Sequence, residues 1–169
     1  MDDEDELLDL VDSNDQLIGT VMRNTTSNPH KGYLRASEMF IQNDQGQLWI
    51  PRRHTAKRIA PGGLDYSMGG HVGSGENYMQ ALIRETKEEL NLDIDRSKLK
   101  LLRKFRPDKQ LRYFRMVYIY KSNEVPKYNP NDFTEYYWMI PEELVAKLKA
   151  GEPAKLSLLE TAEYIISQK

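Results

Sequence analysis

The sequence predicts an α/β (α+β) fold in which a mixed β-sheet lies between helices. Short strand-like segments and helical segments alternate irregularly along the chain, which is typical of a mixed sheet covered by helices. The most regular amphipathic helix, residues 77–90, has strand-like segments both before and after it. The length of 169 residues allows one hydrophobic core but not two, so we expect a single domain over residues 1–169.

The first half of the chain predicts two β-hairpins and a long loop. Residues 1–31 form an N-terminal extension, in which two short apolar runs flank Ser13-Asn14-Asp15 and predict a hairpin followed by a polar loop. A second hairpin is expected from strands at 33–42 and 47–51. Residues 52–75 are rich in glycine and proline and leave room for one short extended piece. A loop of this length inside a compact domain is uncommon unless it is functional.

The second half predicts one long helix, three strands and two short helices. Helix 77–90 is followed by strands at 99–105, 111–120 and 135–140, and then by helices at 141–149 and 156–167. Pro141 suits the first turn of a helix, and the acidic pair after it favours the positive end of the helix dipole.

Composition excludes several classes of protein. Hydrophobic residues make up 39% and charged residues 30%, which fits a folded, soluble chain without a membrane span. Lys and Arg total 24 against 26 for Asp and Glu, so we expect no binding to duplex nucleic acid, and any anionic ligand must be held locally. The chain has no cysteine and an acidic N-terminus, which favour the cytoplasm and exclude thiol chemistry. The sequence does not separate a monomer from a homodimer.

Helix 77–90 carries two distinct stripes. Its apolar stripe, which we expect to face the core, contains Met79, Leu82, Ile83, Thr86 and Leu90. A second stripe at the margin of the first carries the carboxylates of Glu85, Glu88 and Glu89. Arg84 can pair with Glu88 but leaves most of the three charges unanswered, and clustered carboxylates are what Mg²⁺ or Mn²⁺ prefers. The alternative is an ordinary solvated charged face.

The residues around this helix resemble a known motif. Gly70, Glu76 and residues 84–92 are similar to the Nudix box, GX5EX7REUXEEXGU, where U is aliphatic; we call residues 70–92 the Nudix box. Seven of the nine specified positions match. Thr86 replaces an aliphatic residue and Asn91 replaces the closing glycine, for which Asn is the best substitute just past a helix end.

This resemblance implies an α/β/α sandwich with a loop-helix-loop that uses divalent metal to cleave nucleoside diphosphates linked to another group. The implied cofactor is Mg²⁺, with Mn²⁺ as a substitute, and the substrate is a small nucleotide or other diphosphate. The implied metal ligands are Glu85, Glu88, Glu89 and the carbonyl of Gly70, and Glu88 or Glu89 could also polarise the attacking water. Arg84 would orient the carboxylates, and Glu76 would help to fix the loop.

Residues 52–71 are similar to the isopentenyl-diphosphate isomerase branch of this superfamily. That resemblance implies that Arg53 and Lys57 hold a diphosphate and that His71 is a retained site residue; ordinary surface charge and a structural histidine are the alternatives. The branch has a cysteine where this chain has Gly69, and two glutamates on a later strand where residues 112–115 offer none. Because proton transfer across a double bond needs an acid and a base, we expect a hydrolase. An isomerase and a non-catalytic nucleotide-binding module are the alternatives.

Base recognition is open at this point. Seven aromatic residues in the C-terminal half could stack on a nucleobase, although most of them are expected to pack in the core: Tyr113, Phe114, Tyr118, Tyr120, Tyr136, Tyr137 and Trp138. Glu124, Asp132 or Glu135 could hold a second metal or act as a base.

Overall fold

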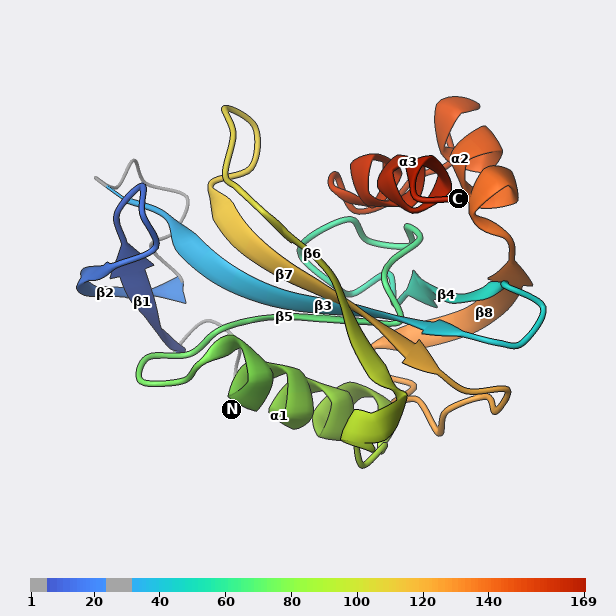
Figure 1. Cartoon of the computed structure of the whole chain (residues 1–169), viewed down its shortest axis with the longest axis horizontal. Helices are drawn as coiled ribbons and strands as arrows, with labels where there is room; N and C mark the ends of the chain where they lie inside the picture. The colour runs from blue at the N-terminus through green and yellow to red at the C-terminus, as the bar shows by residue number, and fades with distance from the viewer. Residues whose placement is uncertain (1–5, 24–31) are drawn as a thin grey trace.

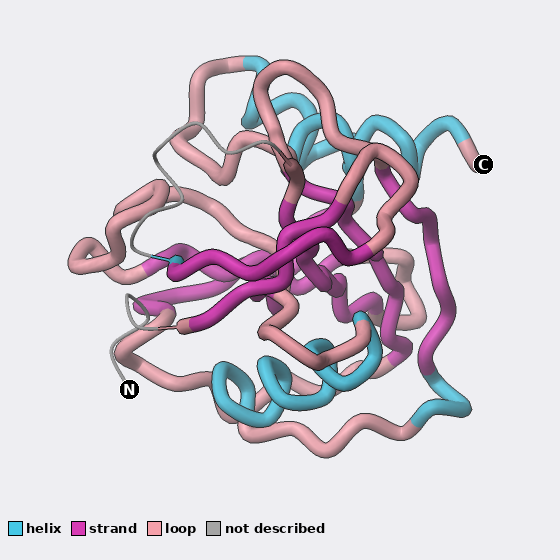
Figure 2. Tube along the Cα trace, turned by 90° about the vertical axis from the view of Figure 1, so that its left-hand side faces the viewer, coloured by secondary structure: helices cyan, strands magenta, loops and turns pink. Residues whose placement is uncertain are grey.

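The computed structural model describes residues 6–23 and 32–169, and it has the predicted mixed sheet between helices. The acidic tip before residue 6 and most of the predicted loop before residue 32 lie outside the described residues. Helix α1 (Tyr78–Leu90) covers one face of the sheet, and α2 (Pro141–Lys149) and α3 (Leu158–Ser167) cover the other (Figure 1). Figure 2 shows the same three layers from the side.

The main sheet has six strands in the order β6-β7-β3-β4-β8, with β5 paired to β3. Its strands are β3 (Leu34–Gln42), β4 (Leu48–Arg53), β5 (Met68–His71), β6 (Leu99–Phe105), β7 (Tyr113–Lys121) and β8 (Phe133–Met139). Strand β3 is antiparallel to β5 and parallel to β7. Between β5 and β7 the chain passes through α1 and β6. Strand β5 is the one short extended piece expected in the glycine-rich loop.

Two hydrophobic clusters lie on the two faces of the sheet. Along β3, Met39 and Ile41 point into the cluster under α1, whereas Phe40 between them points into the cluster under α2 and α3. This alternation is the period of two expected for a strand that is buried on both faces. The sheet is therefore covered on both sides, and its apolar interior holds α1 in place.

Helix α1 begins and ends at side chains that suit those positions. Asn77 is the N-cap, and its side chain and that of Gln80 each accept a hydrogen bond from the other residue's backbone N–H. Asn91 closes the helix in the left-handed conformation, with φ of 50°, as expected for a substitute for glycine. The prediction for Ile83 was wrong: its side chain is 37% exposed, and Ala81 takes the buried position instead.

A separate two-stranded sheet, β1 (Leu7–Val11) and β2 (Leu17–Met22), forms the predicted N-terminal hairpin. It lies at the end of the main sheet where β3 begins (Figure 1). Single bridges join Leu8 to Gly73 and Val11 to Tyr33. The predicted strand and helix limits agree with the observed ones to within two residues, and a short 3₁₀ turn at Arg96–Lys98 was not predicted. None of the described helices is long and apolar enough to cross a membrane.

Candidate active site

The loop between β5 and α1 brings the backbone of Gly70 against the side chain of Glu85. A Cβ atom at position 70 would overlap the Glu85 carboxyl group, so no other residue fits there without displacing that carboxylate. The neighbouring Gly69 donates its N–H to Glu89 Oε2 at 3.3 Å. Gly70 therefore lets Glu85 approach the backbone of β5, and the N–H of Gly69 holds Glu89 beside it.

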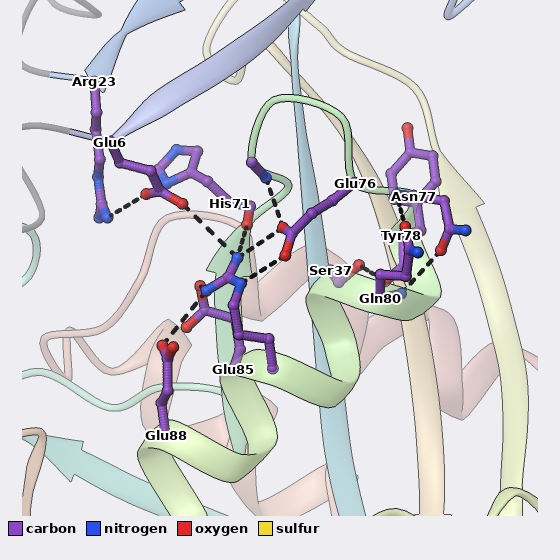
Figure 3. A network of polar contacts seen from close by, with 12 residues as sticks. Glu6, Arg23, Ser37, His71, Glu76, Asn77, Tyr78, Gln80, Glu85 and Glu88 are labelled. Atoms are coloured by element: carbon purple, nitrogen blue, oxygen red, sulfur yellow. Dashed lines mark hydrogen bonds and ion pairs between the residues drawn. The ribbon is translucent and has the colours of Figure 1, made fainter.

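Arg84 links this loop to the helix. Its Nε and Nη2 donate to the two oxygens of Glu76 at 2.7 and 2.9 Å, and Glu76 also accepts the N–H of Gly73 at 2.9 Å. Its Nη1 donates to Glu85 at 2.7 Å and to Glu88 at 3.4 Å. The side chains of Glu76, Glu85 and Glu88 lie close together (Figure 3), and Arg84 contacts all three. One cation thus fixes both the loop and the orientation of two helix carboxylates.

A cavity of about 390 Å³ opens beside these residues, which is within the range of small-molecule sites. Glu85, Glu88 and Glu89 line it, and we call them the acidic wall. Burial raises the pKa of Glu85 to about 7, despite the opposing effect of Arg84. Burial and the nearby charge of Glu85 raise the pKa of Glu89 well above its ordinary value. In the absence of a cation, the surroundings of the acidic wall therefore disfavour the ionised forms of Glu85 and Glu89.

The acidic wall suits a hard divalent cation in its chemistry. All of its ligand atoms are carboxylate oxygens, which Mg²⁺ and Mn²⁺ prefer, and the two most buried carboxylates lack a full counter-charge. Within residues 6–23 and 32–169, however, no three acidic, His or Cys side chains are already grouped to hold a metal ion. The Nη1 atom of Arg84 holds Glu85 and Glu88 instead, so a cation would compete with Arg84 for them.

Of the basic side chains that line the same cavity, we call Arg53, Lys57 and Lys155 the basic wall. Arg53 lies 2.5 Å from Asp65, Lys57 pairs with Asp132, and Lys155 lies 3.4 Å from the other oxygen of Asp65. These pairings fix the positions of the three cations. The predicted alternative of ordinary surface charge does not describe Arg53, whose side chain is only 11% exposed.

His71 lies at another part of the cavity, against the ring of Tyr113, with 5.4 Å between ring centroids. Burial, reinforced by nearby cations, lowers the pKa of His71 to about 3, so its imidazole is neutral at ordinary pH. Its backbone carbonyl accepts from Arg84 Nη2 at 3.2 Å. The two rings give the cavity a neutral, partly apolar region next to the acidic wall.

Of the seven aromatic candidates, Tyr113 lines the cavity, while Phe114, Tyr118 and Tyr120 are buried in the core as the packing interpretation predicts. Of the three candidate acids outside the Nudix box, Asp132 lines the cavity. Glu135 instead pairs with Arg52 at 2.7 Å on the protein surface.

A buried network that was not predicted from the sequence reaches the cavity through Glu38 and Arg115. Glu38 on β3 pairs with Arg115 on β7 at 3.1 Å, and Arg115 also donates to Glu160 at 2.6 Å. Its further hydrogen-bond partners are Tyr66 and Thr161. A charged residue at an inward position of each of two adjacent strands was the available signal, because such residues are rarely buried unless they are paired. The missed Lys155 lies in a loop segment without any such pattern.

Comparison with known proteins identifies the family. The sequence pattern of the NUDIX domain matches residues 32–161. A protein from Nostoc sp. described as an uncharacterized Nudix hydrolase is 45% identical over 159 residues, which is 94% of each chain. The crystal structure of DR0079 from Deinococcus radiodurans has 42% sequence identity and a TM-score of 0.87, over 94% of this chain and 98% of that one. The chain belongs to the Nudix family and is a Nudix hydrolase.

The likeness to the isomerase branch is partial. An isopentenyl-diphosphate Delta-isomerase from Corynebacterium glutamicum is 35% identical over 95 residues, which covers 56% of this chain and 50% of the isomerase. A place for this chain on an isomerase-like branch that lacks the cysteine remains a prediction.

Proposed function

We propose that this Nudix hydrolase uses Mg²⁺, or Mn²⁺ in its place, to cleave a phosphoanhydride bond of a nucleoside di- or triphosphate or a nucleotide derivative with water. The observation that carries the proposal is that one cavity has both an acidic and a basic wall. Carboxylates attract a divalent cation, and fixed cations attract phosphate oxygens. A divalent cation would neutralise the acidic wall, and the phosphates of a small substrate would neutralise the basic wall.

In this proposal, Glu85, Glu88, Glu89 and the Gly70 carbonyl hold the cation. When bound, the cation neutralises charge on the phosphates and activates water for attack. Arg84 orients Glu85 and Glu88, Glu76 fixes the loop, and Glu88 or Glu89 also polarises the attacking water.

Substrate binding in this proposal uses the basic wall and the neutral ring region. Arg53, Lys57 and Lys155 contact phosphate oxygens while keeping their carboxylate partners, because each has more than one N–H to donate. His71 contacts the rest of the substrate, since its neutral imidazole and the adjacent Tyr113 ring offer aromatic surface. We further propose that the enzyme acts in the cytoplasm, as a monomer or homodimer, on neither duplex nucleic acid nor membranes.

The test is a phosphate-release screen with Mg²⁺ and with Mn²⁺ over nucleoside di- and triphosphates, nucleotide sugars, dinucleotides and coenzyme A. We expect turnover of one group of compounds. Glu89→Gln should reduce that turnover at least about 100-fold, because it removes a cation ligand. It should leave the melting temperature unchanged or raise it, because burial and the charge of Glu85 disfavour an ionised carboxylate at this position. Full turnover in Glu89→Gln would contradict the assigned role.

Isomerisation of a prenyl diphosphate is the second candidate, favoured by the partial likeness to isomerases. Against it, this chain has Gly69 where that branch has its cysteine, and a Cβ at this position would lie 3.1 Å from Lys155 Nζ. Incubation with isopentenyl diphosphate in deuterated water, followed by NMR, decides between the two. Deuterium in an allylic product would establish the isomerase.

A non-catalytic nucleotide-binding module is the third candidate. The repulsive carboxylates of the acidic wall argue against it, because a site that only binds anions gains nothing from them. Tight nucleotide binding without metal-dependent turnover in the same screen would support it.

A further inference from the structure

The N-terminal hairpin is joined by its backbone to the Nudix box. The carbonyl of Glu6 accepts the N–H of Arg23 at 2.8 Å, and the carbonyl of Leu7 accepts the N–H of Ser74 at 2.8 Å. The bridge between Leu8 and Gly73 continues this contact. These hydrogen bonds therefore fix the position of Glu6 beside the loop that precedes α1.

The tip of the same hairpin is anchored at a second place. Asp15 accepts from Arg35 on β3 at 2.5 Å and from the hydroxyl of Tyr78, in the first turn of α1, at 2.8 Å. It also pairs with Lys104 on β6. Because two separate points fix the hairpin to the elements that build the site, the hairpin positions side chains as part of that scaffold.

The side chain of Glu6 contacts Arg23 (Figure 3) and also approaches Arg84. Its Oε1 lies 3.7 Å from Arg84 Nη2, and its Oε2 lies 3.2 Å from Nη1 of Arg23, which lines the cavity. A Cβ at Gly73 would lie 3.7 Å from Glu6 Oε1, so this carboxylate also packs against the loop. The Glu6 side chain is only 21% exposed.

Four carboxylates thus share the charge of one guanidinium. Glu85 and Glu88 contact its Nη1, whereas Glu76 contacts Nε and Nη2 and Glu6 approaches Nη2. The two on Nη1 are those for which a cation competes with Arg84. A negative charge on the Nη2 side draws Arg84 away from them and adds to the local negative potential. Both effects favour a cation at the acidic wall.

We propose that Glu6 is a positioning residue of the active site, which acts through Arg84 to keep Glu85 and Glu88 available to a divalent cation. This inference rests on the proposed metal dependence. It assigns to the hairpin, which lies outside the Nudix box, a part in tuning the cation site.

The test is a calorimetric titration of Mn²⁺ alone into the substrate-free protein. Glu6→Gln keeps the shape of the side chain but removes its charge, and we expect it to raise the Mn²⁺ dissociation constant about tenfold, as loss of an outer partner of a metal ligand does. Asp93→Asn is the matched control, because it removes the charge of an exposed carboxylate that pairs with Lys87 of α1 away from the cavity. It should leave the constant unchanged.

Two further variants separate the possible failures. Glu6→Asp keeps the charge and should restore most of the Mn²⁺ affinity. If Glu6→Asp and Glu6→Gln instead lose the same affinity and both have a lower melting temperature, packing of the hairpin is the cause, and the inference is overturned. If Glu89→Gln loses Mn²⁺ but Glu6→Gln binds it like the wild type, this inference fails while the proposed function stands. If the wild-type protein binds no Mn²⁺, both fail.

Discussion

The two walls of the cavity are built in different ways. The acidic wall comes from one turn of one helix, so its three carboxylates are placed by local helix geometry. The basic wall is assembled from the end of β4, the loop after it and the segment before α3, and each of its cations is held by a partner carboxylate. A wall whose residues are close together in the sequence can be predicted from a motif. A wall whose residues come from distant segments forms only when the chain folds. Related chains that share the motif can have different residues in such a wall.

The strongest way to break the acidic wall without touching a carboxylate is Gly70→Ala. The added methyl group overlaps Glu85, and displacing a catalytic group by about 1 Å can cost about 100-fold in turnover. The matched control is Gly19→Ala, whose methyl group would meet nothing within 4 Å. Steady-state turnover of the substrate found in the screen measures both. Equal activity of the two variants would show that the path of Glu85 over Gly70 is unimportant.

The basic wall is tested by Lys155→Met. Loss of one charge-assisted contact to a phosphate should raise KM about tenfold with a smaller change in kcat. Arg53 remains to neutralise Asp65, so the fold should persist. Lys87→Met, which removes an exposed lysine from α1 outside the cavity, should change neither constant. An unchanged KM in Lys155→Met would remove Lys155 from the substrate site.

The smallest expected effect concerns the joint between loop and helix. Hydrogen bonds from Arg84, with a further one from the Gly73 N–H, hold the pKa of Glu76 below its ordinary value of 4.5. The stabilisation from Glu76 is therefore present above that pH and is lost as pH falls through the lowered pKa. Glu76→Gln should cost about 1 kcal/mol at pH 7, discounted for its partial exposure, and less at pH 3. Urea unfolding at the two pH values measures this, and an equal cost at both would contradict it.

The sequence predicted what depends on local patterns. The Nudix box and the extent of α1 follow from spacing and residue type, and Asn91 adopts the left-handed conformation expected of it. Ile83 was misjudged because helical spacing defines an arc but not its edge, and tertiary packing chose Ala81 instead.

The contacts between distant segments could not be predicted. The Glu38–Arg115 pair depends on the register of β3 beside β7, and the contact of Glu6 with Arg84 depends on where the N-terminal hairpin docks. The sequence predicted that hairpin, but hydrophobic pattern alone does not show which surface a hairpin meets. Lys155 reaches the cavity because residues 64 and 154 form a bridge between two loops, which no periodicity indicates.

The central claim is that the acidic wall is a cation site in the same cavity as the basic wall. Anomalous diffraction from crystals of the wild-type protein soaked with Mn²⁺ tests it most directly, because it locates the metal without assuming a substrate. We predict an anomalous peak within bonding distance of carboxylate oxygens of Glu85, Glu88 and Glu89 and of the carbonyl of Gly70. A peak bonded only elsewhere, or none in the cavity when Mn²⁺ is saturating, would contradict the account.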